Sequence, residues 1–375
     1  MTLRSSLLFA PLLAGAHFAQ VASAQAEVPN VVTDMAPIQS LVMQVMGDLG
    51  TPDVLMPQGT SPHGYSLRPS EAKAVQDADV VFWTGPQIEP WLEDLIDEIG
   101  KNTRSVPLTE VEGATLLEVR EGATFERHVH DHDEHAHDDH DDHDDHDEHD
   151  EHDDHDHDAH DHDAHEEHGH DDHDHEDAHE DHDDHDHDAH EEHADDDHDH
   201  DDHDDADGHA WLDPMNAHVW LGAIAEELAV LDAENAATYR ANAASAQEAL
   251  DAQIAEIQAE LAPLADMKFI VFHDAYQYFE NRFGLSAAGS ISIGDASAPS
   301  PARIREIQGK VKEIDVDCVF AEPQFNAGLV KTVLDGTDAR SEVIDPLGVT
   351  LTPGADFYAA LMDEVANSFK ACAGE

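Results

Sequence analysis

Positively charged side chains are scarce in this sequence. It has 17 Lys and Arg against 86 Asp and Glu, a formal net charge of −69 at pH 7. Half of the acids lie in one segment, yet the other 43 still outnumber the basic residues and leave a balance of −26. Proteins that bind nucleic acid neutralise its phosphates with Lys and Arg. The composition therefore excludes nucleic acid as a natural ligand.

Cysteine is almost absent. Cys318 and Cys372 are the only two, and they form no Cys-x-x-Cys pattern, which argues against a zinc–thiolate or dithiol redox site. In an oxidising compartment such a pair usually forms a disulfide. Closing a loop of this length would stabilise the fold by about 4 kcal/mol. Two buried free thiols are the alternative.

Long apolar runs are also missing. A run at residues 7–19 follows Arg4 and precedes a small-x-small pattern at residues 22–24. It is too short to span a bilayer, and no Cys follows it to accept a lipid. We therefore expect residues 1–24 to be a cleavable signal peptide. The mature chain is expected to be soluble in the periplasm of a Gram-negative bacterium.

Histidine, in contrast, is concentrated in one acidic tract. Between His128 and His203 the chain has 28 of its 33 histidines, and residues 128–207 contain 43 acids with no Lys or Arg. Neutral imidazoles bind transition metals, and dense carboxylates attract divalent cations. With so few apolar residues the tract should be a disordered loop that collects metal ions, the alternative being an acidic solubilising insert. The low-affinity ligands expected there include His128, His130, His132, His135, His137 and His203.

The rest of the chain alternates strands and helices in two halves. We expect an N-terminal lobe over residues 25–233, which contains the tract, and a C-terminal lobe over residues 263–375. The expected strands include 30–33, 80–83, 269–272, 318–321 and 342–344, and the expected helices include one ending at Met46 and two at 88–99 and 274–282. Such alternation predicts an α/β fold with parallel sheets flanked by helices and ligands at the carboxyl ends of the strands.

A long helix is expected between the two lobes. Residues 234–262 contain neither Gly nor Pro, and their apolar residues recur at steps of three and four. Such a helix would be about 43 Å long, enough to connect both lobes rigidly. A surface helix within one lobe is the alternative.

Four candidate ligands outside the tract lie where strands give way to loops: His63, His209, His273 and Asp345. Each alone could be a hydrogen-bonded structural residue. Together, two from each lobe, they suit a tetrahedral metal site in a cleft. Glu322 follows a strand and is a candidate to support the site, whereas His218 is expected to be structural.

These residues lie in motifs that resemble a known family. The motifs are GTSPH at 59–63, YSLRPS at 65–70, HAWLDP at 209–214, VFHDAY at 271–276, EPQF at 322–325 and DPLG at 345–348. They are similar to those of the metal-binding solute receptors of ABC transporters, and most similar to the periplasmic receptors for zinc uptake. The likeness covers nearly all of the mature chain and includes a His- and acid-rich insert before the second ligand.

The resemblance implies two lobes joined by a long helix, with Zn²⁺ held in the cleft by His63, His209 and His273. Asp345 is the fourth ligand in many members. Manganese-type members have a carboxylate where this chain has His273, and three imidazoles favour Zn²⁺ over the harder Mn²⁺. Some zinc receptors have Glu before the first His, but Pro62 stands here. The fourth ligand is therefore Asp345, a water or a tract His such as His203.

The Cys318–Cys372 pair also resembles a disulfide of some members. The expected partners are an inner-membrane ABC permease with its cytoplasmic ATPase, and a periplasmic zinc chaperone, with the receptor itself a monomer that is not an enzyme. Two other functions are considered. A zinc hydrolase would need a general base, for which Glu322 could serve, but the chain has no His-Glu-x-x-His motif. A metal-storage protein would explain the tract but not the two lobes.

Overall fold

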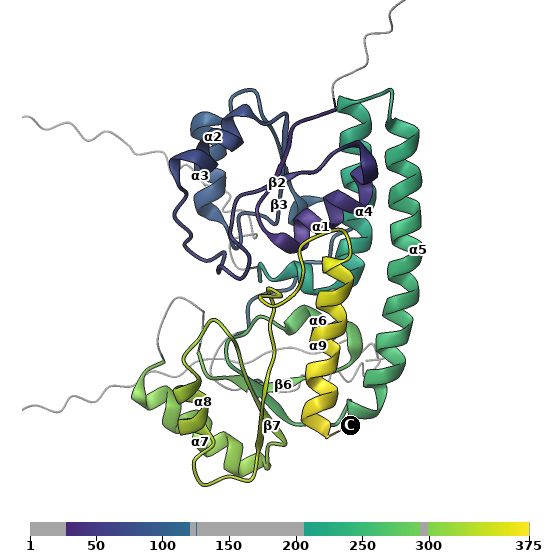
Figure 1. Cartoon of the computed structure of the whole chain (residues 1–375). Helices are drawn as coiled ribbons and strands as arrows, with labels where there is room; N and C mark the ends of the chain where they lie inside the picture. The colour runs from purple at the N-terminus through teal and green to yellow at the C-terminus, as the bar shows by residue number, and fades with distance from the viewer. Residues whose placement is uncertain (1–27, 121–124, 126–205, 293–298, 375) are drawn as a thin grey trace, which may run out of the picture. The chain divides into compact units, whose positions relative to one another are not determined.

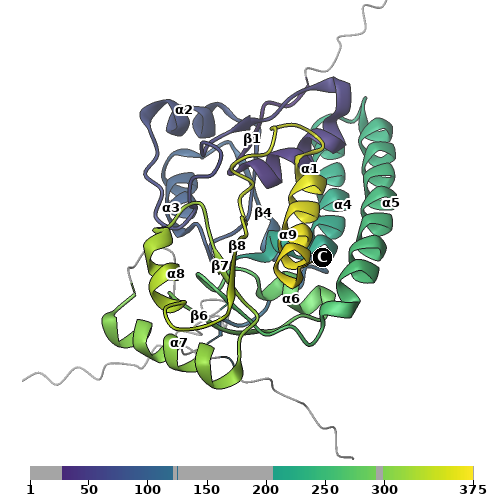
Figure 2. The ribbon, with the colours of Figure 1, turned by 60° about the horizontal axis from the view of Figure 1, so that its bottom comes forward.

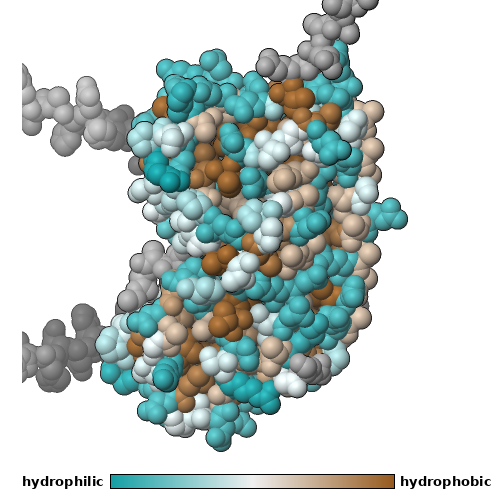
Figure 3. Space-filling model, in the orientation of Figure 1, coloured by the Kyte–Doolittle hydropathy of each residue, from teal (hydrophilic) through white to brown (hydrophobic). Residues whose placement is uncertain are grey.

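The computed structural model describes residues 28–120, 125, 206–292 and 299–374, all within one unit of the chain. The predicted signal peptide and the tract up to residue 205 lie outside these residues. In the described part, no helix combines the length and apolar character needed to cross a membrane. Most of the face seen in Figure 3 is hydrophilic, with apolar residues in small groups.

The N-terminal lobe is built on a sheet of four parallel strands in the order β2-β1-β3-β4. They are β1 (Val31–Thr33), β2 (Asp53–Val54), β3 (Val80–Trp83) and β4 (Arg104–Pro107). Helices α1 (Ala36–Met46), α2 (Pro69–Asp77) and α3 (Pro90–Ile99) alternate with them. The two central strands, β1 and β3, are apolar throughout apart from Thr33 and are buried along their length, as expected for parallel strands covered on both faces.

The C-terminal lobe repeats this arrangement, in the order β6-β5-β7-β8. Its strands are β5 (Phe269–Val271), β6 (Ala287–Ser290), β7 (Cys318–Ala321) and β8 (Arg340–Val343), and its helices are α6 (Gln277–Phe283), α7 (Pro301–Ile314), α8 (Ala327–Val333) and α9 (Phe357–Ala373). In both sheets the first strand lies between the second and the third. The second strand is added on one side of it and the later strands on the other, so the strand order reverses at this point. Ligands of open α/β sheets bind at such a reversal. The predicted α/β class is confirmed.

Two long helices, α4 (Pro214–Leu231) and α5 (Ala236–Leu261), lie between the sheets in sequence. Helix α5 packs on α4 and α1 and also on α9 and α6, so it contacts both lobes (Figure 1). Its buried residues are Tyr239, Ala243, Leu250, Ile257 and Leu261, all from the apolar stripe that the sequence predicts. The connecting helix is therefore confirmed.

The C-terminal helix α9 lies against α1 and α5 as well as β8 (Figure 2). Cys372 near its end forms a disulfide with Cys318 at the start of β7, with Cα atoms 6.0 Å apart. The predicted disulfide is thus present, and it fixes the last helix to the second sheet.

The helix predicted over residues 274–282 starts later than expected. Helix α6 begins at Gln277, and residues 274–276 form a turn in which Ala275 N donates to His273 O. The carboxylate of Asp274, which could have capped a helix, is bound by Arg120 instead. A long-range ion pair has overridden a local preference.

Candidate metal centre

Three histidines from three separate segments converge at the junction of the lobes: His63, His209 and His273. Each offers one ring nitrogen, and these nitrogens all lie within 4.8 Å of one another. His63 lies in the loop between β2 and α2, His209 immediately precedes the 3₁₀ helix η3 (Ala210–Leu212), and His273 is the second residue after β5. The group could hold a metal ion.

The spacing of these nitrogens is close to what zinc requires. Zn–N bonds of about 2.0–2.1 Å in tetrahedral geometry place ligand nitrogens about 3.3 Å apart. His63 Nε2 and His209 Nε2 are 3.1 Å apart, and the ring centroids of His209 and His273 are separated by 5.3 Å. Small side-chain adjustments would bring all three nitrogens to one ion.

His209 is oriented by Asp207. The Asp207 Oδ1 atom lies 2.7 Å from His209 Nδ1 and also accepts a hydrogen bond from His209 N at 3.0 Å. A carboxylate at Nδ1 keeps the proton there and leaves Nε2 free to bind metal. Gly208 between them passes so close to the N-terminal lobe that a Cβ atom would lie 2.6 Å from Ile88 Cβ. Only glycine therefore fits this path.

Glu322 supports His273 in the same way. Its Oε1 atom lies 2.7 Å from His273 Nδ1, and both residues are buried. Glu322 follows β7, the strand next to β5, so Glu322 and His273 meet where the strand order of the second sheet reverses. Glu322 thus lies beside the site, where the sequence motif places it, whereas the role of Asp207 was missed. Asp207 is one acid among dozens in its neighbourhood, and only its position two residues before His209 could have marked it.

His63 is held by its neighbours in the loop. Trp91 Nε1 donates to Pro62 O at 2.9 Å, and the rings of Tyr65 and Trp91 meet edge to face. Burial, together with the electrostatic effect of the neighbouring His209 and His273 side chains, lowers the pKa of the His63 imidazole from 6.5 to about 3. His63 is therefore neutral near pH 7, as a metal ligand must be.

Asp345 is buried close to the site but is not part of the group of three. Its Oδ1 atom accepts hydrogen bonds from Leu347 N and Gln324 Nε2, both at 3.0 Å, and its Oδ2 atom accepts one from Val349 N at 2.6 Å. The carboxylate thus holds the turn after β8 together. Because a carboxylate has about four lone-pair positions, one remains for a cation.

The cavity beside the histidines is small and mostly apolar. Its volume is about 20 Å³, room for one water-sized body. The apolar wall consists of Trp211, Phe325, Pro346 and Leu347, with Pro62 at the His63 side. A single ion fits this space.

The sequence also indicated roles for His218 and for the histidines of the tract. His218 lies on α4, where its Nε2 atom is 3.6 Å from Asp251 Oδ1, which agrees with the structural role expected for it. The tract histidines His128, His130, His132, His135, His137 and His203 lie outside the described residues.

Comparisons with known proteins agree with this architecture. A family model described as zinc-uptake complex component A, periplasmic (ZnuA) matches residues 31–372. The chain is 44% identical over 370 residues to the high-affinity zinc uptake system protein ZnuA of Brucella abortus (strain 2308), covering 99% of this chain and 98% of that protein. It is 40% identical to the protein of the same name from Paracoccus denitrificans (strain Pd 1222), with the same coverage.

Solved structures show the same fold. A crystal structure of ZnuA superimposes with a TM-score of 0.60 at 22% identity and covers 91% of this chain and 99% of its own. The laminin-binding adhesin Lmb of Streptococcus agalactiae superimposes with a TM-score of 0.62 at 21% identity, over 91% of this chain and 98% of its own. From the extent of these matches we conclude that the chain belongs to the ZnuA family of periplasmic zinc-uptake components.

Proposed function

We propose that this protein binds Zn²⁺ in the periplasm and delivers it to an ABC permease of the inner membrane, which a cytoplasmic ATPase drives. The convergence of three imidazoles on one ion-sized cavity carries the proposal. Two of these imidazoles have a carboxylate at Nδ1, which raises the basicity of the nitrogen that faces the metal. Nitrogen ligands suit Zn²⁺ better than the harder Mn²⁺.

The proposed ligands are His63, His209 and His273, with Asp345 as the fourth. Asp345 is already held at the end of β8 by its hydrogen bonds. It would therefore pay a smaller ordering cost on binding than a donor from a flexible segment. Asp345→Asn keeps the shape but removes the charge, so zinc binding should weaken at least about tenfold, or about 1.4 kcal/mol. Wild-type affinity in this variant, beside severe loss in His63→Ala, would remove Asp345 from the ligand set.

The His-rich tract is proposed to collect zinc through many weak and exchanging contacts. Tethered ligands raise the concentration of metal near the tight site without adding to its contacts. We further propose a monomeric receptor that a periplasmic zinc chaperone can supply. No catalytic role is proposed, because the chain belongs to a family of zinc-uptake components.

A competitive zinc titration of the mature protein and of a version with residues 128–203 replaced by a short linker tests the proposal. Native mass spectrometry should show one tight equivalent in both proteins and several weak equivalents only with the tract. Loss of the tight equivalent on shortening would show that the tract supplies primary ligands. Loss of all tight binding in the full-length protein would contradict the receptor function, and turnover of a chromogenic ester would instead indicate a hydrolase.

A further inference from the structure

Two short segments form a pair beside the metal centre. Glu118 and Ala206 make an antiparallel bridge, and Asp207 N donates to Leu117 O at 2.7 Å. We call residues 117–120 together with residues 206–207 the clasp. The pairing brings together two points that are nearly 90 residues apart in the chain.

The clasp is bound to the C-terminal lobe through α6. The hydroxyl group of Tyr278 accepts a hydrogen bond from Leu117 N at 3.0 Å and donates one to Asp207 O at 2.6 Å. Tyr278 is buried, and its hydroxyl uses its donor and one acceptor position on the two halves of the clasp. Gln277 Nε2 also donates to Glu118 O at 3.2 Å. Both halves are therefore fastened to one helix.

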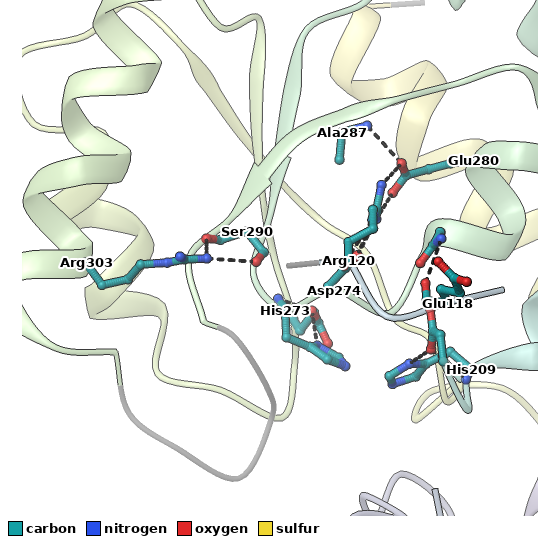
Figure 4. Close-up of polar contacts among 12 residues, drawn as sticks. Glu118, Arg120, His209, His273, Asp274, Glu280, Ala287, Ser290 and Arg303 are labelled. Carbon is teal, nitrogen blue, oxygen red and sulfur yellow. Dashed lines mark hydrogen bonds and ion pairs between the residues drawn. The ribbon is translucent and has the colours of Figure 1, made fainter. Parts of the chain in front are cut away.

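Arg120 makes the strongest attachment. Its Nε atom lies 2.9 Å from Asp274 Oδ2, and its Nη1 atom lies 2.7 Å from Glu280 Oε2 (Figure 4). The guanidinium carbon lies 4.1 Å from the centre of the Phe125 ring, so the cation is also covered. The side chains of Arg120, Asp274 and Glu280 are only 18%, 11% and 3% exposed. Little solvent screens these ion pairs.

The clasp ends at two of the three candidate ligands. Asp207 in the clasp binds the His209 ring, and Asp274, bound by Arg120, is the residue after His273 (Figure 4). A chain of protein contacts thus joins His209 of the N-terminal lobe to His273 of the C-terminal lobe. His63 lies on a different loop.

We propose that Arg120 is a positioning residue of the metal centre. Through the clasp it holds His209 and His273 as a prearranged pair of ligands, beside which His63 already lies. Holding two ligands in place before binding reduces the entropic cost of ordering them, and this cost would otherwise weaken zinc binding. This inference rests on the proposed function.

The test compares four Arg120-related variants with a control. Arg120→Met removes the attachment but leaves two buried carboxylates unpaired, which can prevent folding. The triple variant Arg120→Met/Asp274→Asn/Glu280→Gln removes the attachment and the charges together. Arg120→Lys keeps one charge but cannot bind two carboxylates with a planar fork. The double variant Asp274→Asn/Glu280→Gln keeps Arg120 but replaces its two ion pairs with weaker hydrogen bonds to neutral side chains.

Tyr239→Phe is the control for lost stability. It removes a buried hydrogen bond from Tyr239 OH to Asp232 Oδ2 at the start of α5 and touches neither clasp nor ligands. It should lower the midpoint of urea unfolding yet keep the wild-type zinc affinity. The absorption spectrum of bound Co²⁺, used as a probe of ligand geometry, should also stay unchanged in this variant.

Zinc affinity should fall about 10–100-fold in the folded Arg120 variants, the usual effect of losing a group that orients a metal ligand. Their Co²⁺ spectra should change, and Arg120→Lys should not restore either property. A folded triple variant with wild-type zinc affinity and Co²⁺ spectrum would contradict the positioning role of the clasp but not the proposed function. A loss of zinc affinity no larger than that in Tyr239→Phe would have the same meaning. Absence of tight zinc binding in the wild type would overturn the clasp and the proposed function together.

Discussion

The histidines of the metal centre differ in how they are oriented. The Nδ1 atoms of His209 and His273 each lie 2.7 Å from a buried carboxylate oxygen, of Asp207 and Glu322 respectively. His63 presents Nε2 towards His209 Nε2. Each carboxylate favours the tautomer with the proton on Nδ1, so the Nε2 lone pair of each of these two buried rings can bind a metal.

Selectivity can be tested at His273. A single His273→Glu change would place two carboxylates together in a buried site, because Glu322 contacts this position. We therefore pair it with Glu322→Gln, which can donate a hydrogen bond to the new carboxylate. The double variant should bind Zn²⁺ at least about tenfold more weakly, while Mn²⁺ binding is kept or improved, because a hard oxygen replaces a borderline nitrogen.

Competition titrations with the two metals measure this shift. Glu322→Gln alone is the control, since it keeps all three imidazoles and should retain the preference for Zn²⁺. Unchanged Zn²⁺ affinity in the double variant would show that His273 does not bind the metal.

The low pKa of His63 predicts how the metal-free protein responds to acid. Burial lowers this pKa from 6.5 to about 3 in the folded state. Between these values the unfolded chain binds a proton at His63 and the folded chain does not, so stability falls as the pH is lowered through this window. His63→Asn removes the titrating group, and its stability should fall less than that of the wild type.

Urea unfolding of both metal-free proteins at pH 7.5 and pH 5 measures the difference. Histidines remote from His63 are common to the two proteins, so their protonation cancels, whereas any change at His209 and His273, which interact with His63, is part of the measured difference. Equal losses of stability between the two pH values would contradict the buried neutral state of His63.

At the scale of elements, sequence patterns predicted what local periodicity determines. The stripe of α5 from Tyr239 to Leu261 follows a helical repeat, and apolar strands such as β7 stand out from their flanks. The start of α6 and the roles of Asp207 and Arg120 were not predicted. The start of α6 and the role of Arg120 depend on the ion pair between Arg120 and Asp274, which lie far apart in the sequence and which no local pattern identifies. Asp207 contacts the nearby His209, but it is one acid among many in its segment.

A contact between two loops closes the His63 side of the centre. Gln58 Nε2 lies 2.5 Å from Gly348 O and 2.7 Å from Leu351 O, in the turn that Asp345 holds together. The loop carrying His63 in the N-terminal lobe is therefore joined to the C-terminal lobe next to the site. We expect this contact to slow the release of zinc.

Gln58→Glu tests this contact with almost no change in shape. The new carboxylate would face carbonyl oxygens instead of donating to them, and losing a partly buried hydrogen bond costs about 1–3 kcal/mol. Zinc should dissociate about tenfold faster, as followed by stopped-flow transfer to a chelator. Gln308→Glu is the matched control, because Gln308 Nε2 likewise donates to a carbonyl oxygen, that of Thr332, between α7 and α8. Equal rates for all three proteins would rule out a role for Gln58.

Across the whole molecule, two sheets with the same strand order use their reversal points differently. In the C-terminal lobe the point between β5 and β7 presents His273 and Glu322 to the cavity. In the N-terminal lobe the corresponding point between β1 and β3 is filled by hydrogen bonds within the lobe. There, Asp34 Oδ2 accepts hydrogen bonds from Thr84 N and Thr84 Oγ1 at 2.6 and 2.7 Å. The candidate ligands of the N-terminal lobe come instead from two loops, those of His63 and His209.

This arrangement predicts where the His- and acid-rich tract ends and the candidate metal centre begins. The acidic composition continues to Asp207 without a break, but Ala206 and Asp207 belong to the clasp and Asp207 binds His209. Replacing residues 128–205 with a short linker should therefore leave the tight zinc equivalent unchanged. Extending the replacement to residue 207 removes only one more charge, yet it should weaken tight binding about 10–100-fold.

Competitive titration of the two shortened proteins measures the effect, with Asp207→Asn in the full-length chain as a single-residue comparison. That variant keeps an oxygen that can accept from His209 Nδ1 but loses the charge, so its affinity should fall between those of the two shortened proteins. If both shortened proteins bind zinc equally tightly, Asp207 acts only as part of the acidic tract. If both lose tight binding, residues before 206 supply a primary ligand, and a tract histidine such as His203 replaces Asp345 as the fourth.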